Sequence, residues 1–543
     1  MLRIGVVLDS LISSAWVVKV IEGIQSSGFA RIELVVLQAG SRQGRSSALF
    51  DRYERWDYRR NKAKCDATAQ VDAAPLLRDV PSLTVDTDVL SDVLSEDQLG
   101  TIRQRDLDVL LLFRPSGLWH SAADAVRYGV WSFHFGESTR ETDAPDLWEA
   151  LVRRNPVSTS SLRIVTGVRG EGRTIYRSHA STDQLSIYSS RNPVYWKTAE
   201  FALRRLRDLD QHGIESIDSL PDEGDVKADV RDGNRGPSSL QVILFMRRHV
   251  ARWLQARIAS MHRWPRTRWF IGIRQRNEGR SFDDTSSYRL LPCPEDRFYA
   301  DPFLIEKDGK TFLFLEDFRY REGRALLSCC EIGPDGTPSV PVEVLRRPYH
   351  LSYPYVFEHE GEMYMIPETK ENRRVELYRA TNFPAEWAFE SVLLDDVHVV
   401  DATVQKIDGK FWMFAGVSDG RYSNSDELCI FYADALKGPW TPHPANPVCS
   451  DVRRSRPAGL LFYDEGRLVR PSQDCGKAYG YALVFSEVVT LNEEKYEERV
   501  IRRIEPGSVK GCIGTHTYNR TERFEVIDRT LPANTAKGDT DRA

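Results

Sequence analysis

The fold of the second half of the chain is decided by four short segments: Asp301-Pro-Phe-Leu, Tyr353-Pro-Tyr-Val, Asp401-Ala-Thr-Val and Arg456-Pro-Ala-Gly. A turn glycine follows the start of each segment by 8, 8, 8 and 10 residues, at Gly309, Gly361, Gly409 and Gly466. Each glycine leads into a second strand-like stretch: KTFLFLED, EMYMIPE, KFWMFAG and RLVRPSQD. A degenerate fifth copy begins at His516-Thr-Tyr-Asn. A repeat of about 50 residues made of short strands is typical of a propeller blade, so we predict a five-bladed β-propeller over residues 285–530.

The repeat also places polar side chains at equivalent positions. Because the innermost strand of each blade lines the central channel, the segment starts should face one mouth: Asp301, Tyr353, Asp401, Arg456 and His516. Seven residues beyond the turn glycines stand three more polar residues, which hairpin geometry returns to the same end: Glu316, Glu368 and Gln473. Several carboxylates around one channel suit general acid–base catalysis or recognition of sugar hydroxyls. The alternative is that they cap turns in a structural blade.

Composition and charge narrow the class of protein. With 543 residues the chain is too long for one ordinary domain, and 41% hydrophobic and 28% charged residues fit soluble globular domains. A net charge of -5 gives no global cationic field, and we expect no nucleic-acid partner. No apolar run reaches the roughly 18 residues of a membrane span. Eight cysteines without a CxxC pair predict reduced thiols in a cytosolic protein, with neither a metal site nor a disulfide framework.

The first half of the chain alternates short apolar strands with helical patterns. The stretches LRIGVVLD at 2–9, IELVVLQ at 32–38 and DVLLLFR at 108–114 predict a parallel α/β sheet. Residues 41–75 are rich in Arg, Ser and Asp, and we expect them to form a long surface excursion. Residues 217–239 carry Pro, Gly and charge without periodicity, which predicts a linker.

A strongly basic connector follows at 240–276. Between Gln241 and Arg276 it has nine arginines and no acid, and five apolar residues fall near helical spacing: Ile243, Met246, Val250, Trp253 and Leu254. One interpretation is a packing helix with a solvated arginine face. A second is an amphipathic helix on an anionic membrane surface, with four arginines on the headgroups: Arg247, Arg248, Arg252 and Arg257. A third is contact with nucleic acid.

Two resemblances concern the propeller. Tyr-Ala-Asp-Pro-Phe at 299–303 resembles the first-blade motif of five-bladed glycoside hydrolases and fructosyltransferases, and Asp401 sits where their third-blade aspartate stands. The resemblance implies catalytic roles for Asp301 and Asp401, with Glu368 as the candidate acid or base. The fourth blade departs from the pattern, because Arg456-Pro-Ala-Gly stands where arabinanase-like members place a glutamate. This departure argues against simple hydrolysis.

Longer motifs over 345–500 look like the N-terminal propeller of plant glucosamine inositolphosphorylceramide transferases: His350-Leu-Ser-Tyr-Pro-Tyr-Val-Phe, Gly361-Glu-Met-Tyr-Met-Ile-Pro-Glu368, Gly438-Pro-Trp-Thr-Pro-His and Gln473-Asp-Cys-Gly. This resemblance implies a sugar or glycolipid substrate. In the plant proteins a glycosyltransferase domain follows the propeller, and we expect no room for it before residue 543, so the transferase activity is not implied. We expect seven residues to bind substrate, with the two arginines offsetting a phosphate or carboxylate: Glu316, Tyr353, Arg456, Arg470, Gln473, Asp474 and His516.

Residues 105–180 resemble formyltransferases of the methionyl-tRNA and glycinamide-ribonucleotide type. DLDVLLLFRPSGL matches the strand before their active site, and YGVWSFHFGES places His134 at the catalytic histidine, with Ser132 in place of the usual asparagine. SLRIVTGVRGEGRTIYRS matches the hairpin that supplies the catalytic aspartate, and here Glu171, beside Gly170, is the nearest acid. Formyl transfer needs an oxyanion donor and an oriented His–carboxylate pair. The resemblance implies formyltetrahydrofolate as cofactor only if this domain is active; the alternative is a domain kept for binding or docking.

These observations predict a multidomain protein, α/β followed by all-β. A formyltransferase-like (Rossmann-type) parallel sheet spans 1–215, a linker and basic helix 216–284, the propeller 285–530 and a polar tail 531–543. Three functions are compatible: a sugar-transferring or sugar-processing enzyme of glycolipid or surface-polysaccharide assembly, a non-catalytic glycan- or protein-binding module held at the membrane, or a sugar-nucleotide N-formyltransferase. We expect a cytoplasmic location, with the inner face of the membrane as the alternative.

Overall fold

The computed structural model describes the whole chain apart from residues 40–46, 87–92, 137–145, 166–171, 219, 221–236, 261–266, 277–280, 283, 285–287, 509–510 and 533–543. Most of the predicted linker and of the predicted polar tail therefore lies outside the described residues. The chain forms two compact units, Met1–Gln255 and Ala256–Ala543. In the part of the chain that the structure describes, no helix is both long and apolar enough to cross a membrane.

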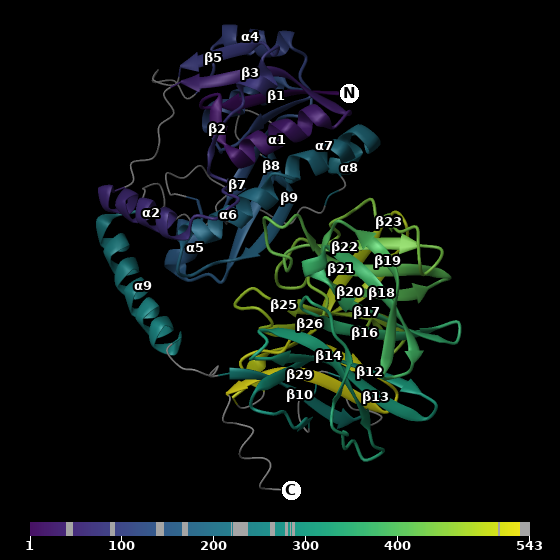
Figure 1. The fold of residues 1–543 in the computed structure, drawn as a ribbon. Coiled ribbons are helices and arrows are strands. Elements are labelled where there is room, and N and C mark those ends of the chain that lie inside the picture. The colour runs from purple at the N-terminus through teal and green to yellow at the C-terminus, as the bar shows by residue number, and fades with distance from the viewer. Residues whose placement is uncertain are drawn as a thin grey trace. The chain divides into compact units, whose positions relative to one another are not determined.

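The first unit is built on a seven-stranded sheet (Figure 1). Its strands, in sheet order, are β5 (Ser82–Asp86), β3 (Ala30–Ala39), β1 (Leu2–Leu8), β6 (Val109–Leu112), β7 (Val130–Phe135), β8 (Val157–Val165) and β9 (Gly172–Ser181). The first five are parallel, and β8 and β9 extend the sheet as an antiparallel hairpin. The predicted α/β class with a parallel sheet is confirmed; the closer likeness to formyltransferases stays a prediction.

Helices cover both faces of this sheet, as its apolar strands require. On one face α1 packs against β3 and α7. On the other, side chains of α4 and of the 3₁₀ helix Gly117–Ala125 join the strand residues in one core. The helices of the unit are α1 (Ala15–Ser26), α2 (Ala48–Asn61), α3 (Ala74–Leu77), α4 (Glu96–Gln104), α5 (Trp148–Arg153), α6 (Ile187–Thr198), α7 (Phe201–His212), α8 (Glu215–Asp218) and α9 (Ser239–Ser260), and two short strands pair beside them, β2 (Ile12–Ser14) and β4 (Gln70–Asp72).

The region expected to be a surface excursion contains an ordered helix instead. Helix α2 begins after Ser47, whose hydroxyl accepts a hydrogen bond from the amide of Phe50. Phe50 and Tyr53 are buried because they are three residues apart and share one helix face. That face packs against Trp148 of α5 and Phe245 of α9. The exposed side of α2 carries Arg52, Arg55, Arg59 and Arg60, whereas Asp57 is buried and accepts hydrogen bonds from Ser186 and the amide of Tyr188.

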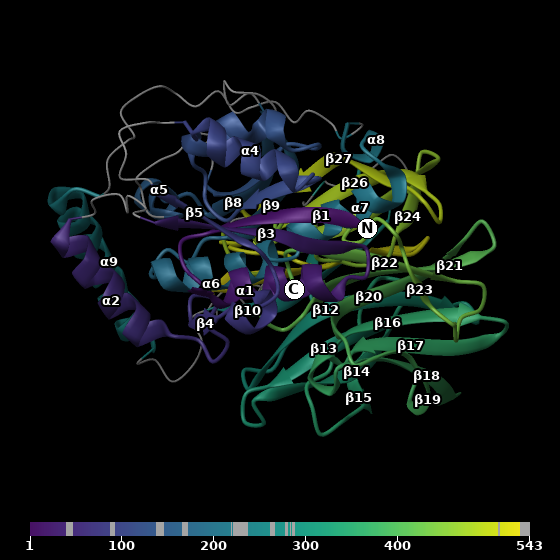
Figure 2. The same ribbon diagram turned by 90° about the horizontal axis from the view of Figure 1, so that it is seen from above.

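The second unit is a five-bladed β-propeller, as predicted (Figure 2). The strands of the first four blades, from the inside outward, are β12 (Arg297–Lys307), β13 (Lys310–Arg319), β14 (Arg324–Ile332) and β15 (Val342–Leu345); β16 (Ser352–His359), β17 (Glu362–Glu368), β18 (Arg374–Asn382) and β19 (Glu386–Asp395); β20 (His398–Ile407), β21 (Lys410–Ser418), β22 (Leu428–Ala433) and β23 (Thr441–Pro442); β24 (Phe462–Asp464), β25 (Arg467–Asp474), β26 (Ala482–Leu491) and β27 (Tyr496–Ile504). Two short 3₁₀ helices, Lys370–Asn372 and Pro506–Ser508, lie in its loops.

The fifth blade closes the ring by combining both ends of the propeller segment. Its strands are β28 (Tyr518–Arg520), β29 (Phe524–Pro532), β10 (Thr267–Gln275) and β11 (Arg289–Leu290). Strand β10 pairs with β29 along its whole length, although sequence analysis placed residues 267–275 in the connector and began the propeller at 285. The pairing joins strands more than 240 residues apart in the chain, so no local pattern could reveal it.

The four glycines of the repeat lie in hairpin turns, as the repeat predicted. Each sits at the second position of a two-residue hairpin turn, with φ between +75° and +85°, and the residue before it is also left-handed: Asp308, Glu360, Asp408 and Glu465. Positive φ at both central positions is the type I′ geometry whose twist matches that of paired strands. In the first three blades, the interval between segment start and glycine thus covers the part of the inner strand that follows the register shift, together with the turn.

Candidate functional site

The starts of the first three inner strands share one backbone irregularity. Pairing between the first two strands of each blade shifts register at Asp301, Tyr353 and Asp401. All three have positive φ, +48°, +46° and +53°, although none is glycine or asparagine. Such a conformation costs energy for a residue with a Cβ and is concentrated at functional sites. At these positions the three side chains reach neighbouring blades: Asp301 contacts Thr517, Tyr353 contacts Thr403, and Asp401 contacts Arg456.

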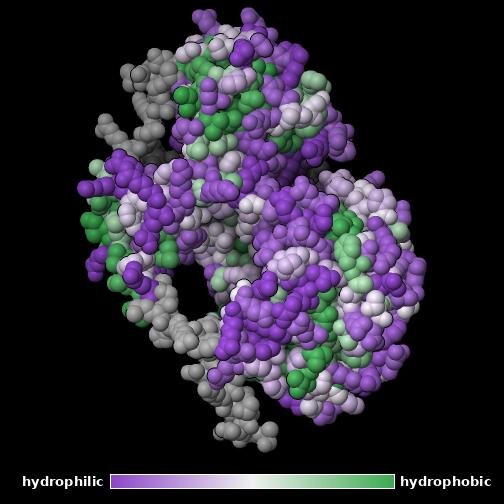
Figure 3. Space-filling model, in the orientation of Figure 1, coloured by the Kyte–Doolittle hydropathy of each residue, from purple (hydrophilic) through white to green (hydrophobic). Residues whose placement is uncertain are grey.

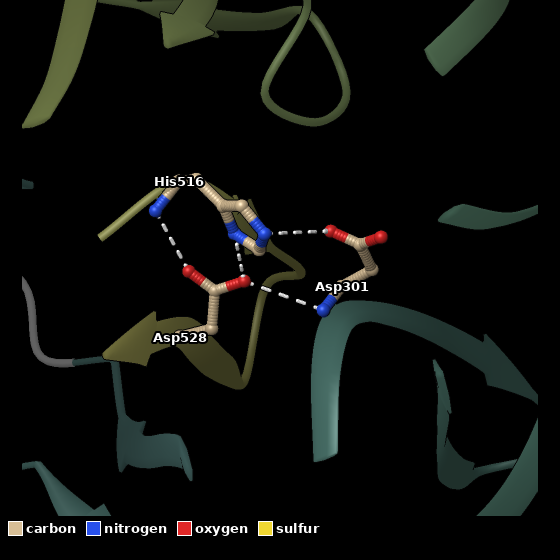
Figure 4. Close-up of side chains that lie close together, drawn as sticks. All are labelled: Asp301, His516 and Asp528. Atoms are coloured by element: carbon tan, nitrogen blue, oxygen red, sulfur yellow. Dashed lines mark hydrogen bonds and ion pairs between the residues drawn. The ribbon is translucent and has the colours of Figure 1, made fainter. Parts of the chain in front are cut away.

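Asp301 belongs to a buried group of charges that joins blades one and five (Figure 4). His516 Nδ1 contacts the Asp528 carboxylate, and His516 Nε2 lies 3.8 Å from Asp301 Oδ1. Thr517 Oγ1 donates to Asp301 Oδ1 at 2.7 Å, and the amide of Tyr353 donates to Oδ2 at 3.1 Å. The ligand atoms of Asp301, His516 and Asp528 all lie within 4.8 Å of one another, a spacing that would suit a metal ion. Protein hydrogen bonds already engage these carboxylate oxygens, so we assign no metal to the group.

A second group of charges joins blades two, three and four. Arg456 donates to both oxygens of Asp401, with Nε to Oδ2 at 2.6 Å and Nη2 to Oδ1 at 3.3 Å. The same guanidinium lies 3.5 Å from Glu368 Oε2. Gln473 Nε2 donates to Asp401 Oδ2 at 3.0 Å. Four residues predicted from the repeat therefore meet. We call these residues, with Asp301, Glu316, Tyr353, His516 and Asp528, the central cluster.

Tyr353 ties the inner strands together. It is completely buried, and its hydroxyl lies 2.9 Å from Thr403 Oγ1 of blade three. The same hydroxyl accepts a hydrogen bond of 2.8 Å from the amide of Gly459 in blade four. This side chain thus reaches from blade two to the opposite side of the ring. Because it is buried and fully bonded, its contribution is to the architecture of the central cluster rather than to substrate contact.

Glu316 and Glu368 are the acids best placed to hold a proton. Burial, and next the charges of Asp301 and Glu368, raise the pKa of Glu316 well above its usual range. Burial and then the Asp401 carboxylate raise the pKa of Glu368 in the same way, against the opposing charge of Arg456. Glu368 Oε2 is buried and accepts no hydrogen bond in the described structure. A raised pKa favours the protonated carboxylic acid, which is the form that can donate a proton.

Asp301 and His516 also titrate away from their ordinary values. Burial raises the pKa of Asp301 to about 6, although His516 opposes the shift. Burial alone would lower the pKa of His516, but Asp528 and Asp301 raise it above its usual value. The imidazolium form of His516 therefore offsets part of the negative charge of the two aspartates.

Aromatic rings border the central cluster. Trp269 of β10 stacks on His516 with ring centroids 4.0 Å apart and an angle of 12°. Tyr479, on the turn between β25 and β26, meets His516 edge-on at 5.3 Å and lies under the guanidinium of Arg456 at 5.0 Å. Tyr479 is 52% exposed, so it connects the buried charges to the protein surface. Flat aromatic faces beside carboxyl groups are a surface on which a sugar ring can stack.

Two predicted substrate-binding residues lie in a different network. Arg470 is buried and pairs with Glu498, and Asp474 pairs with Arg503 and accepts a hydrogen bond from the amide of Gly476. Arg470 is three residues from Gln473 on strand β25, and an odd spacing on a strand points the side chain to the opposite face. Neither residue has a described contact with the central cluster. In this structure they stabilise blade four.

The candidate residues of the first unit form a neutral pair. Ser132 Oγ lies 2.7 Å from His134 Nε2 near the carboxyl end of β7. Burial, and then the charges of Arg163 and His120, lower the pKa of His134 to about 3, so its imidazole is neutral at neutral pH. Glu171, predicted as its acidic partner, lies outside the described residues. Among the described residues, the groups around His134 lower its pKa and so weaken it as a base. We therefore assign them no role in folate chemistry.

Three contributors to the cluster were not predicted: Asp528, Thr517 and Trp269. Asp528 could not be found by counting from the turn, because the β28–β29 hairpin has no glycine at the equivalent position. Thr517 follows His516 directly and carried no signal of its own. Trp269 reaches the cluster only because β10 closes the ring.

Comparison with known proteins agrees with the propeller. The family model described as glucosamine inositolphosphorylceramide transferase 1, N-terminal, matches residues 291–530. The relative named glucosamine inositolphosphorylceramide transferase 1 from Oryza sativa subsp. japonica is 34% identical over 237 residues, which are 41% of this chain and 32% of the relative. The one from Arabidopsis thaliana is 34% identical over 205 residues, 37% of this chain and 27% of the relative. This chain thus spans about a third or less of the length of these relatives.

Solved structures show only distant likeness. A GH43 protein from Bacillus licheniformis matches with a TM-score of 0.29 and 14% identity, over 40% of this chain and 50% of that one. A family 117 glycoside hydrolase from Zobellia galactanivorans matches with a TM-score of 0.32 and 11% identity, over 49% of this chain and 91% of that one.

Proposed function

We propose that this protein processes or transfers sugars in the assembly of glycolipids or surface polysaccharides, with the central cluster of the propeller as its site. The observation that supports this most is the Glu368–Asp401–Arg456 group. It sets a buried acid with a raised pKa beside a carboxylate that is already paired with a cation. Acid–base chemistry at a sugar oxygen uses two carboxyl groups with such contrasting surroundings. The 34% identity to plant proteins named for a glycolipid supports the same substrate class.

In this proposal each member of the group has a separate role. Glu368 donates its proton to the glycosidic oxygen as the bond between that oxygen and the anomeric carbon breaks, because its Oε2 is not engaged in a hydrogen bond. The oxygen of water or of an acceptor hydroxyl forms the new bond to the carbon and releases its own proton. Arg456 and Gln473 bind the Asp401 carboxylate, and Asp401 in turn raises the pKa of Glu368 and so favours its protonated form. Tyr479 offers the exposed ring against which the sugar packs.

A second function, a glycan-binding module without catalysis, is favoured by one observation. Asp301, His516 and Tyr353 are almost wholly buried and bonded to one another or to backbone amides, so they serve the architecture as well as any chemistry. A binding module would need only the exposed ring of Tyr479 that borders the cluster, with the Arg456 guanidinium against it. We assign the first unit no catalytic step in either function, because the low pKa of His134, about 3, makes its imidazole a weak base.

The test compares isosteric changes in the full chain. We expect Glu368→Gln and Asp401→Asn to abolish function in a surface-glycan complementation assay in the source organism, and His134→Ala to be tolerated. Glu376→Gln is the matched control, because Glu376 is also buried in blade two but bonds to Tyr349, Tyr378 and Asn372 away from the cluster. Loss of function with His134→Ala and none with the cluster variants would transfer the chemistry to the first unit.

Saccharide binding separates the enzyme from the binding module. For an enzyme, Glu368→Gln should bind oligosaccharides with unchanged affinity by calorimetry while product formation is lost. For a binding module, the wild type forms no product, and Tyr479→Ala removes binding and complementation together. Glu368→Gln, Tyr479→Ala and His134→Ala must first melt at the wild-type temperature, and Asp401→Asn, which leaves Arg456 without its carboxylate partner, must be folded at the assay temperature.

A further inference from the structure

Helix α9 is apolar on two opposite faces. Its inner face packs on the first unit through Val242 and Phe245, which are 0% and 8% exposed. Phe245 contacts the rings of Tyr53 and Trp148 at centroid distances of 5.4 and 5.1 Å. On this face the helix packs against the core of the first unit. A helix docked in this way normally presents polar residues on its other side.

The outer face of α9 is instead lined by aliphatic side chains. Five of them are between 42% and 66% exposed: Leu240, Ile243, Leu244, Val250 and Leu254. At 3.6 residues per turn these positions form one stripe along the helix, opposite to Val242 and Phe245. Of the five residues with helical spacing in the sequence, Met246 packs against the core of the first unit, whereas Ile243, Val250 and Leu254 face solvent. The fold of the first unit does not account for this second stripe.

The surroundings of the stripe are strongly basic. Arg247 and Arg248 are exposed on α9, Arg252 is half-buried, and the sequence of the helix contains no acid. Helix α2 lies alongside, as both ribbon views show, and adds four exposed arginines: Arg52, Arg55, Arg59 and Arg60. Trp56 of α2 is 43% exposed and lies beside His249 of α9, with Arg60 over its ring. Figure 3 shows hydrophobic side chains among hydrophilic ones over these two helices.

We propose that this α2–α9 surface binds an anionic lipid bilayer. Aliphatic residues on a convex helix face can enter the boundary between headgroups and acyl chains, while arginine and tryptophan stay at the headgroups. Each basic residue near an anionic surface strengthens binding about five-fold. A second copy of the chain is a poor occupant, because a symmetric interface would bring the same arginines together. Nucleic acid is also a poor occupant, since phosphate binding gives no role to five exposed aliphatic side chains. The inference is independent of the proposed sugar chemistry.

Vesicle sedimentation of the full chain tests this inference. We expect binding to vesicles of phosphatidylcholine with phosphatidylglycerol and none to phosphatidylcholine alone. The variant Leu240→Gln/Ile243→Gln/Leu254→Gln should bind at least about ten-fold more weakly at every salt concentration, because it loses insertion. The variant Arg247→Gln/Arg248→Gln/Arg252→Gln should bind about 100-fold more weakly at low salt and differ little at high salt. Adding Arg257→Gln tests whether the fourth predicted arginine contributes.

Two matched controls keep the result interpretable. Val340→Gln/Val489→Gln removes exposed aliphatic residues and Arg78→Gln/Arg321→Gln removes exposed arginines elsewhere, and both should bind like the wild type. Equal binding by the aliphatic variant and the wild type would overturn the proposal. So would equal wild-type binding to both kinds of vesicle, or retention on DNA or on an acidic protein without vesicle binding. If a variant melts at a lower temperature than the wild type, the proposal is judged from wild-type binding alone. That binding should require anionic lipid and weaken as the salt concentration rises.

Discussion

Replacing Arg456 tests whether the charged side chains of the central cluster are buried and ion-paired. The guanidinium forms two hydrogen bonds with Asp401, at 2.6 and 3.3 Å, and lies 3.5 Å from Glu368. The side chains of Arg456 and Asp401 are only 12% and 2% exposed. Removing one partner of a buried ion pair costs about 3–5 kcal/mol, because the remaining charge is left without compensation. We therefore expect Arg456→Met to lower the unfolding free energy by about that amount.

The double variant separates pairing from burial. In Asp401→Asn/Arg456→Met neither charge remains, and the asparagine oxygen can still accept from Gln473. The double variant should be more stable than the sum of the single changes by about 2–3 kcal/mol. The measurement is chemical denaturation of the full chain, with hydrogen exchange of peptides from blades three and four to assign the transition.

An exposed pair provides the control for this cycle. Arg373 and Asp396 lie 2.6 Å apart with side chains 47% and 83% exposed, so the cycle Arg373→Met and Asp396→Asn should give at most about 1 kcal/mol. A similarly small effect of Arg456→Met, or strict additivity with Asp401→Asn, would refute the buried geometry and the proposed role of Asp401.

Three further outcomes follow from the propeller. Tyr353→Phe should lower the unfolding free energy by about 1–3 kcal/mol in chemical denaturation, because the Gly459 amide loses its acceptor inside the protein; a change near zero would mean that water reaches this position. The pKa of Asp301 is raised to about 6, so its protonation stabilises the fold fully below pH 3.8 and this contribution, about 3 kcal/mol, is lost as the pH rises through 6. When the unfolding free energy is plotted against pH, the curves of the wild type and of Asp301→Asn should therefore converge as the pH falls. Parallel curves would contradict the raised pKa. Glu360→Asn should raise the unfolding free energy by about 0.5–1 kcal/mol and so raise the melting temperature slightly. The reason is that asparagine tolerates the left-handed φ of +52° better than glutamate does. A lower melting temperature would contradict the type I′ turn.

The repeat was predictable because hairpin turns and inner strands are local. A two-residue turn fixes where glycine must stand, and the strand length fixes the interval, so four blades could be read from spacing alone. For blade five the repeat gave only the copy that begins at His516 and could not show that β10 completes the blade, because β10 and β29 pair across almost the whole propeller. The same limit hid Trp269, which lies near His516 only through that pairing.

Helix α9 shows a different limit. Periodicity identifies which residues share a helix face, but it does not tell which face is covered. Ile243, Val250 and Leu254 are spaced like a packing stripe, yet Val242 and Phe245 are the residues that pack. The partner surface on α2 belongs to a segment whose arginines made it look like a loop, so sequence gave no reason to choose between the two stripes.

The central cluster joins two roles that sequence cannot separate. Asp301 holds blades five, one and two together through His516, Thr517 and the amide of Tyr353, so its burial and its strained φ are explained by ring closure alone. Glu368 differs, because its Oε2 is buried beside Arg456 without a hydrogen bond. The Arg456 guanidinium, 3.5 Å away, offsets the charge of Glu368, although Arg456 is itself bound more closely to Asp401. Glutamine keeps the shape of the glutamic acid side chain but has no acid proton to donate. Glu368→Gln therefore tests the proposed proton transfer with little change in packing.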